Sequence, residues 1–220
     1  MRKLVEGVLR YQRDVHAEHG ELFESLAKGQ RPHTLFVTCS DSRIHPSLVT
    51  STKPGELFVM RNAGAIIPPY GAASGGESAT IEFAVEGLGV QDIVVCGHSH
   101  CGAMQGLLNR EALKRFKEMD AWLRFGEAAI RATAAWVDTL SPEELLNAVI
   151  QRSALAQLDH LRTHPSVAAA IDEGRVRLHA WEYRFESGDV LAYDPSCGRF
   201  RPIAELADSY QDALATAKRD

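Results

Sequence analysis

A short run of β-branched residues, Ile93–Val95, leads directly into a cluster of cysteine and histidine side chains. The residues that follow the run are Cys96, Gly97, His98, Ser99, His100, Cys101 and Gly102. Such a run predicts a buried strand, and its polar end predicts a turn before a helix. In open α/β sheets, ligand sites lie at the carboxyl ends of the strands. The segment therefore predicts a sheet with a ligand site where this strand ends.

The spacing of His98 and Cys101 suits a metal ion, because a thiolate and an imidazole three residues apart can converge on one ion. Zinc takes Cys sulfur and His nitrogen in a tetrahedral arrangement. Two ligands do not complete such a site, so another segment must contribute. The best candidate is Cys39, which follows a second apolar run, Thr34–Val37, and is followed two residues later by Asp41.

The strands fall at regular positions along the first half of the chain. They are expected near residues 35, 58 and 93, with helical segments between them, which is typical of βα units around a parallel sheet. Both ligand segments then lie at strand carboxyl ends on one edge. We predict an α/β fold with a mostly parallel central sheet flanked by helices, and no domain boundary within residues 1–220.

Other segments surround this core. Apolar side chains at helical spacing predict an N-terminal amphipathic helix over residues 2–19. Residues 102–174 have a helical pattern with no evident chemistry, so they are interpreted as structural. Residues 178–193 predict a hairpin, a C-terminal antiparallel extension of the sheet, and a last helix is expected over about 203–217.

Composition excludes several classes of function. The net charge of −5 and the lack of a basic stripe argue against nucleic-acid binding, and no apolar run approaches the roughly 18 residues of a membrane span. The first residues carry no secretory signal pattern, so a cytoplasmic location is expected. In that compartment, four cysteines are more often ligands, catalytic thiols or buried residues than disulfides.

The residues alone leave several alternatives open. A lone Cys39 is more often an inert buried thiol. The nearby Asp41 and Arg43 shift that balance, since a guanidinium can hold a carboxylate in a bidentate pair beside a metal. His98 and His100 compete as ligands, and the pattern does not decide between them. Cys96 is interpreted as a packed strand residue, and Cys197 as a turn residue.

Three segments together resemble the signature blocks of the β-class carbonic anhydrases, in order and at the usual separations. They are Cys39-Ser40-Asp41-Ser42-Arg43, Phe58-Val59-Met60-Arg61-Asn62-Ala63-Gly64 and Gly97-His98-Ser99-His100-Cys101-Gly102. The resemblance implies that Cys39, His98 and Cys101 hold Zn²⁺ and that Asp41 and Arg43 form a catalytic dyad. It also favours His98 over His100.

The resemblance implies reversible hydration of carbon dioxide to bicarbonate and a proton, by attack of zinc-bound hydroxide that the Asp-Arg dyad orients. In carbonic anhydrases with three histidine ligands, zinc lowers the pKa of bound water to about 7. Two thiolates put more negative charge on the metal, which should raise that pKa. The dyad would then matter, because it fixes the direction of the hydroxide lone pair.

The resemblance also implies a substrate pocket and an assembly. Gln30 matches an amide that hydrogen-bonds substrate, Phe58 matches an apolar wall, and Phe83 stands where plant members carry a tyrosine. Without the resemblance, Gln30 would be a solvated loop residue and the two phenylalanines ordinary core residues. In the family these pockets lie at a subunit interface, so a homodimer or a tetramer of dimers is implied, and the N-terminal helix has an apolar stripe suited to a partner subunit.

Part of the family binds a second, inhibitory bicarbonate between a tryptophan, an arginine and a tyrosine, and the aspartate then moves onto the metal. Arg61 and Tyr183 match two of these positions, but Phe36 stands at the tryptophan position. A phenyl ring has no N–H donor, so we predict that Asp41 stays paired with Arg43 at neutral pH. Asp41 remains a conditional fourth metal ligand in acid.

Two rivals from other classes remain. A purely structural zinc module would show a fourth Cys or His ligand and no hydration activity, but it has no need of an Asp41–Arg43 pair. A hydrolase would use Cys39 as nucleophile and His98 as base. Two cysteines near one histidine favour the metal over this second alternative.

Overall fold

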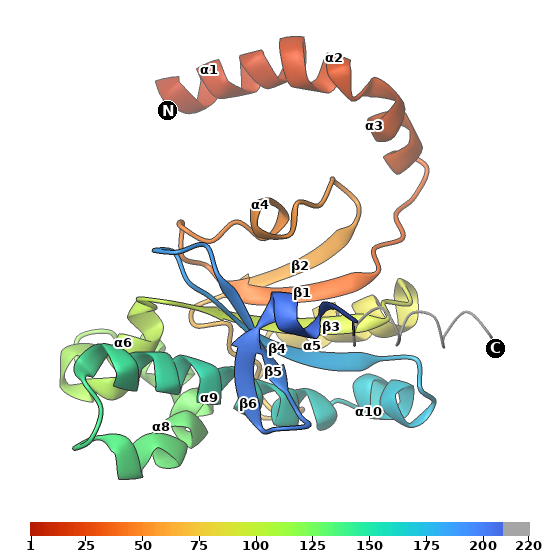
Figure 1. Cartoon of the computed structure of the whole chain (residues 1–220). Helices are drawn as coiled ribbons and strands as arrows, with labels where there is room; N and C mark the ends of the chain where they lie inside the picture. Colours follow the sequence, from red (N-terminus) through yellow and green to blue (C-terminus); the bar gives the residue numbers. More distant parts are fainter. Residues whose placement is uncertain (209–220) are drawn as a thin grey trace.

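A single six-stranded sheet forms the centre of the protein (Figure 1). The computed structural model describes residues 1–208. The strands run in the order β2-β1-β3-β4-β5-β6 across the sheet. Their bounds are β1 Thr34–Cys39, β2 Leu57–Asn62, β3 Asp92–His98, β4 Arg177–Tyr183, β5 Val190–Asp194 and β6 Arg199–Pro202.

The sheet is mostly parallel, as predicted. Strands β2, β1, β3 and β4 are parallel, whereas β5 and β6 continue the sheet antiparallel. The first strand of the predicted hairpin, β4, is therefore the fourth parallel strand. It follows a long helical crossover from β3, and a crossover of this kind returns the chain in the same direction. The antiparallel extension is β5 with β6, a four-residue strand that the sequence analysis did not predict.

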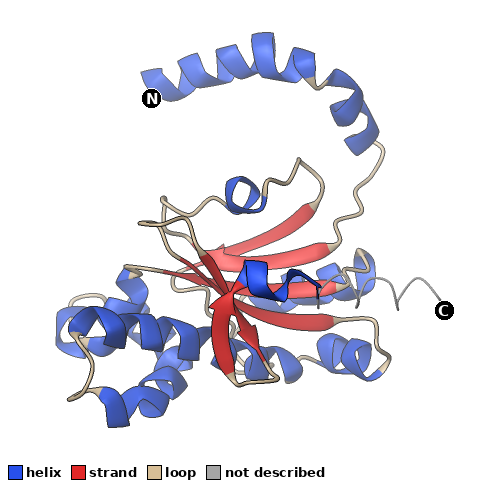
Figure 2. Ribbon diagram, in the orientation of Figure 1, coloured by secondary structure: helices blue, strands red, loops and turns tan. Residues whose placement is uncertain are grey.

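Helices lie on both sides of the sheet, unequally (Figure 2). In the described residues the α-helices are α1 Arg2–Arg10, α2 His16–Glu18, α3 Gly20–Leu26, α4 Pro46–Thr50, α5 Gly76–Glu82, α6 Gly102–Leu108, α7 Lys117–Leu123, α8 Glu127–Thr133, α9 Pro142–Arg162 and α10 Pro165–Asp172. The long helix α9 begins at the predicted capping box of Ser141 and Glu144 and packs on β3 and β4. Short α4 lies over the opposite face, next to β2 and β1 (Figure 1).

Alternation along the strands separates two hydrophobic clusters. Leu35 and Val95 point toward α9 and α10 and are fully or almost fully buried. Phe36 and Val94 point to the opposite face, where they border a cavity of about 270 Å³. Successive strand residues face opposite sides, so both clusters follow from the sequence of the same strands.

The N-terminal helical segment extends away from the sheet (Figure 1). Helix α1, a π-helical turn over Tyr11–Val15 and α2 form one arm over residues 2–18, as the predicted amphipathic helix requires. No residue of α1 is buried. Its apolar side chains are exposed to solvent: Leu4 is 66% exposed and Leu9 is 57% exposed. Exposed apolar surface of this extent is typical of an interface.

Two predictions extend beyond residue 208, the last residue that the structure describes. The predicted last helix over 203–217 appears as a 3-10 turn at Ile203–Leu206, and its remainder lies largely outside the described residues. The single domain over residues 1–220 stays a prediction. Within residues 1–208, no helix combines the length and the apolar character needed to cross a membrane.

Candidate metal centre

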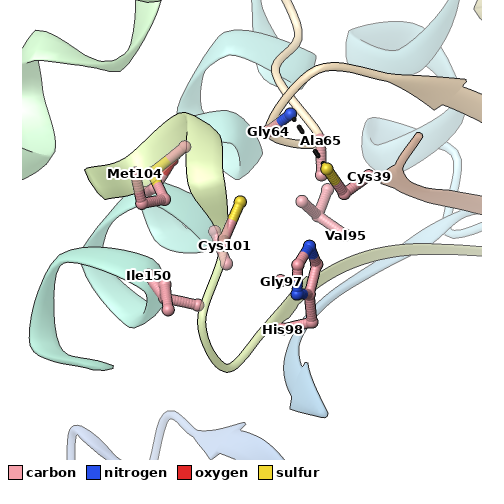
Figure 3. Close-up of a pocket in the computed structure, with 11 residues that line it drawn as sticks. Cys39, Gly64, Ala65, Val95, Gly97, His98, Cys101, Met104 and Ile150 are labelled. Atoms are coloured by element: carbon pink, nitrogen blue, oxygen red, sulfur yellow. Dashed lines mark hydrogen bonds between the residues drawn. The ribbon is translucent and has the colours of Figure 1, made fainter. Parts of the chain in front are cut away.

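The carboxyl ends of two neighbouring parallel strands bring the three predicted ligands together. Cys39 is the last residue of β1, and His98 is the last residue of β3. The register pairs Thr38 with Cys96, so the two strands end side by side. Cys101 lies three residues after β3, at the N-cap of α6. Figure 3 shows these side chains facing one another across a small cavity.

These side chains form a buried cluster with the composition of a metal site. The Sγ atoms of Cys39 and Cys101 and a ring nitrogen of His98 lie within 4.8 Å of one another. His98 is fully buried, and its Nε2 atom has no hydrogen-bond partner among residues 1–208. A buried nitrogen in that state is costly unless something binds it. Zinc binds sulfur at about 2.3 Å and imidazole nitrogen at about 2.1 Å, so this donor set fits a zinc ion.

The hydrogen bonds of the cluster set its proton positions. The carbonyl oxygen of Ser99 lies 2.8 Å from His98 Nδ1, so Nδ1 carries the proton and Nε2 keeps its lone pair. A hydrogen bond with Cys101 lowers the pKa of the Cys39 thiol, and the Gly64 amide donates to Cys39 Sγ at 3.3 Å. The same contact, together with burial, raises the pKa of Cys101. One thiolate forms readily, and a bound cation would favour the second.

Asp41 and Arg43 form a bidentate ion pair at the edge of the cluster. Arg43 Nε donates to Asp41 Oδ1 at 2.9 Å, and Nη2 donates to Oδ2 at 2.8 Å. These hydrogen bonds hold the pKa of Asp41 well below its usual range. Asp41 Oδ2 lies 4.0 Å from His98 Nε2. The carboxylate is therefore beside the cluster and bound to Arg43. That Asp41 keeps this partner when metal is bound at neutral pH stays a prediction.

Arg61, on β2, holds the loop that follows Cys39. Its guanidinium donates to the carbonyl oxygens of Cys39, Asp41 and Ile44 at distances between 2.7 and 3.1 Å. These bonds fix the backbone that carries the Asp41 carboxylate. An anion at Arg61 would have to compete with three carbonyl acceptors for the same donors.

The two other residues matched to the inhibitory bicarbonate site pack against aromatic neighbours. Phe36 is almost fully buried and meets Trp181 edge-on, with ring centroids 6.0 Å apart. Tyr183 meets Phe185 in a T-shaped contact at 5.4 Å. The expectation that Phe36 weakens such a site stays a prediction.

The residues predicted to line the substrate pocket lie away from the cluster of their own chain. Phe58 pairs with Leu35, four residues before Cys39, which corresponds to about 13 Å along the strand. Phe83 packs against Phe58 at 6.0 Å and is 52% exposed. Gln30 is exposed and precedes β1, toward the same amino-terminal edge. Within one chain, none of the three is among the residues that line the metal cavity.

The remaining histidine and cysteines have other surroundings. His100 Nε2 lies 3.5 Å from Glu186 Oε2, and only His98 of the two histidines belongs to the ligand cluster found in residues 1–208. Cys96 is fully buried in β3, and burial raises its pKa to about 12. Cys197 is exposed in a turn. Both cysteines agree with their sequence-based interpretations.

Several residues at the site were not found by sequence reasoning. Helix α9, interpreted as purely structural, contributes Ile150 and Ser153 to the cavity beside the cluster. A Cβ atom at Gly97 would lie 2.6 Å from Ile150 Cγ2, so the glycine permits this close approach. Phe185 places its ring 4.9 Å from that of His98. No spacing within the motifs signals contacts between segments this far apart in the chain.

Comparison with known proteins agrees with this geometry. The family model described as carbonic anhydrase matches residues 34–190, which include all three candidate ligands. The chain belongs to the β-class carbonic anhydrase family. A carbonic anhydrase of Pseudomonas aeruginosa is 48% identical over 93% of this chain and 93% of its own length. One from Synechocystis sp. is 45% identical over 88% of this chain and 71% of its own length.

Solved structures of β-class carbonic anhydrases share the whole fold. The β-carbonic anhydrase CcaA superposes with a TM-score of 0.89 at 43% identity and covers 92% of this chain and 91% of its own. One of two tetrameric β-carbonic anhydrases from Sordaria macrospora gives a TM-score of 0.77 at 27% identity, covering 91% and 95%. The predicted fold class is therefore confirmed, and the chain is a carbonic anhydrase family enzyme.

Proposed function

We propose that this protein catalyses the reversible hydration of carbon dioxide to bicarbonate and a proton. The observation that carries the proposal is the buried Cys39–His98–Cys101 cluster with a paired carboxylate 4.0 Å from its free imidazole nitrogen. The substrate is small and apolar and its product is an anion, so the reaction needs a nucleophile, a way to aim it, and little else. Family membership points to the same reaction.

Zinc is the proposed cofactor, held by Cys39 Sγ, Cys101 Sγ and His98 Nε2. When bound, the ion would supply the Lewis acidity that turns water into a nucleophile near neutral pH. The chain prepares its own donors for this role. The Ser99 carbonyl fixes the imidazole tautomer, and the Gly64 amide stabilises the Cys39 thiolate.

Asp41 and Arg43 are proposed to orient the nucleophile. Both carboxylate oxygens are bound by Arg43, so the side chain cannot rotate freely, and it stays ionised because its pKa is lowered. An ionised carboxylate accepts a hydrogen bond but does not donate one. Asp41 would therefore accept a hydrogen bond from a hydroxyl group and leave the oxygen lone pair directed at the substrate carbon.

The substrate pocket is proposed to be completed by a second copy of the chain. Gln30, Phe58 and Phe83 cannot line the metal cavity of their own chain in this fold, yet Phe83 is exposed and available to another. The exposed apolar stripe of α1 provides a surface for the same assembly. A twofold dimer would place these residues of one subunit near the metal of its partner. Pairs of such dimers and a cytoplasmic location remain predictions.

The two rival functions explain less of the geometry. A structural zinc module leaves the Asp41–Arg43 pair without a purpose. A Cys-His hydrolase requires Cys39 to act as a nucleophile, but Cys101 lies in the same cluster and the site is deeply buried. Alkylation that abolishes activity while zinc is retained would favour the hydrolase.

The test combines metal analysis with stopped-flow carbon dioxide hydration on Asp41→Asn. Asparagine has nearly the same shape but carries an N–H₂ donor group and no charge. We expect close to one zinc per chain in both proteins and a fall of about 10- to 100-fold in kcat/KM for the variant. A zinc-loaded wild-type protein without hydration activity would refute the proposed function, and an unimpaired variant would remove Asp41 from the mechanism.

A further inference from the structure

The connection between β4 and β5 is a tightly held loop that lies over the metal centre. Within residues 184–189, the Arg184 amide donates to the Asp189 carbonyl and the Gly188 amide donates to the Arg184 carbonyl, each at 2.9 Å. The Ser187 hydroxyl donates to Asp189 Oδ2 at 2.6 Å. Gly188 has a φ of 79°, which favours glycine. The loop therefore has one defined shape, and it carries Phe185.

The Phe185 ring packs against two side chains of the site, the His98 imidazole and the Arg43 guanidinium. Its ring centroid lies 4.9 Å from that of the His98 imidazole, with the ring planes inclined by 44°. The guanidinium carbon of Arg43 lies 4.8 Å from the same ring centroid, within the range of a cation–π contact. Arg43 thus has its donor edge on Asp41 and an aromatic ring beside it. No signature block contains Phe185.

Hydrogen bonds of Ser99 connect this loop to the segment that carries His98 and Cys101. Its hydroxyl donates to Glu186 Oε2 at 2.8 Å and accepts a hydrogen bond from the Phe185 amide at 3.0 Å. Its own amide donates to the Tyr183 carbonyl at 2.9 Å. Ser99 is almost fully buried, so these bonds are shielded from water. The position of the Phe185 ring relative to His98 is therefore fixed through the backbone.

We propose that Phe185 is a positioning residue that holds the Arg43 guanidinium, and through it the Asp41 carboxylate, in a fixed relation to the His98 imidazole. The inference rests on the proposed function, because it assigns the ring a part in orienting the same nucleophile. The Arg43 side chain is 51% exposed, so the Phe185 ring covers only one side of the guanidinium, and Nη2 also donates to the His100 carbonyl oxygen at 3.2 Å. Loss of the ring would expose that side as well and weaken the hold on the guanidinium. Asp41 Oδ1 also accepts a hydrogen bond from the Arg43 backbone amide at 3.0 Å, so Oδ2, the oxygen nearer His98, is the one whose position depends on the guanidinium.

The chemistry of the ring makes the proposal specific. An aromatic face attracts a cation through its quadrupole, which an aliphatic side chain of similar volume lacks. Leucine or methionine at position 185 would fill much of the space but release Arg43. Tyrosine would keep the ring and restore the contact.

The experiment uses the full-length, zinc-loaded enzyme and compares Phe185→Leu with Phe185→Tyr. Phe200→Leu is the matched control, because Phe200 is also half-buried and its ring meets that of Tyr193 at 5.6 Å, at the β6 edge of the sheet. We expect Phe185→Leu to lower kcat about three- to tenfold with little change in KM. Phe185→Tyr and Phe200→Leu should stay within about twofold of wild type. Phe185→Met gives the same reading if the leucine variant does not fold.

A double-mutant cycle with Arg43→Ala separates positioning from packing. If Phe185 acts through Arg43, then Phe185→Leu should cost little further kcat once Arg43 is alanine. Equal losses in Phe185→Leu and Phe200→Leu, equal losses in the tyrosine and leucine variants, or full additivity in the cycle would each overturn the proposal.

A readout without turnover distinguishes this inference from the proposed function. Cobalt substitution gives visible absorption bands that report the ligand geometry at the metal. We expect Phe185→Leu to change these bands because the imidazole loses its neighbouring ring, and we expect Phe200→Leu to leave them unchanged. An unchanged spectrum would refute the contact's role at His98, even in a protein that hydrates no carbon dioxide.

Discussion

The carboxyl ends and the amino-terminal ends of the parallel strands differ in whether one chain brings the predicted site residues together. At the carboxyl ends, Cys39, His98 and Cys101 are buried and converge on one position. At the amino-terminal end of β2, Phe58 and Phe83 pack on each other, but Phe83 is half exposed and faces no cavity of its own metal centre. One chain brings the three candidate ligands together, whereas the residues predicted to line the substrate pocket lie away from them.

This difference predicts that metal binding and catalytic activity have separate structural requirements. Metal binding depends on contacts inside one subunit, so it should survive changes that disturb assembly. If a partner subunit completes the pocket as proposed, activity depends on both ends of the strands and should fail when either is altered.

The largest effect is expected for Cys39→Ala. Removing one of three ligands leaves an incomplete donor set, so the variant should lose nearly all of its zinc and its hydration activity. Cys197→Ser is the control, because that thiol is exposed and far from the ligands in the chain. Metal analysis by mass spectrometry and a hydration assay measure both outcomes. Full zinc occupancy in Cys39→Ala would remove Cys39 from the ligand set.

An intermediate effect is expected when two inactive proteins are mixed. One carries Cys39→Ala, and the other carries Gln30→Ala with Phe83→Ala on an intact metal centre. If the pocket is completed by the partner, a mixed dimer has one intact site, so subunit exchange should restore up to about a quarter of wild-type activity. If the pocket lies within one chain, mixing will restore no activity. That result would contradict a substrate pocket completed by the partner subunit.

The two ends were not equally predictable from sequence. Cys39 and Asp41 were predicted because they follow an apolar run whose end a parallel sheet brings to one edge, whereas His98 was preferred over His100 only through the family resemblance. Phe185 and Ile150 were missed because they reach the centre through tertiary packing, which leaves no periodic signal in their own segments. The register of β1 against β2 could not be predicted from the sequence either. The separation of Phe58 from the metal centre is therefore known only from the structure.

The smallest effect concerns Glu182, which is fully buried on β4 beside Gly97. Burial raises its pKa, so the ionised form opposes folding. Such an acid weakens the fold above its folded-state pKa and not below its unfolded-state value of about 4.3. Glu182→Gln should therefore raise Tm by roughly a few degrees at pH 8 and leave it unchanged near pH 4.

The matched variant for this prediction is Glu182→Ala. Gln151 Nε2 donates to Glu182 Oε2 at 2.6 Å, and glutamine keeps an acceptor there, whereas alanine leaves the donor unsatisfied. Alanine should lower Tm at both pH values. Calorimetry measures these shifts, and zinc content should not change. Equal stabilisation at pH 4 and pH 8 would show that the charge of Glu182 is not the cause.

The hydrogen bonds of Ser99 to the β4–β5 loop also affect how the protein is made. All three ligands lie within the first 101 residues, but Phe185 and Glu186 emerge from the ribosome 85 residues later. At roughly 5 to 20 residues per second, that interval lasts about 4 to 17 seconds. Throughout it, the ligand segments of the nascent chain lack the loop that packs on His98 in the finished fold.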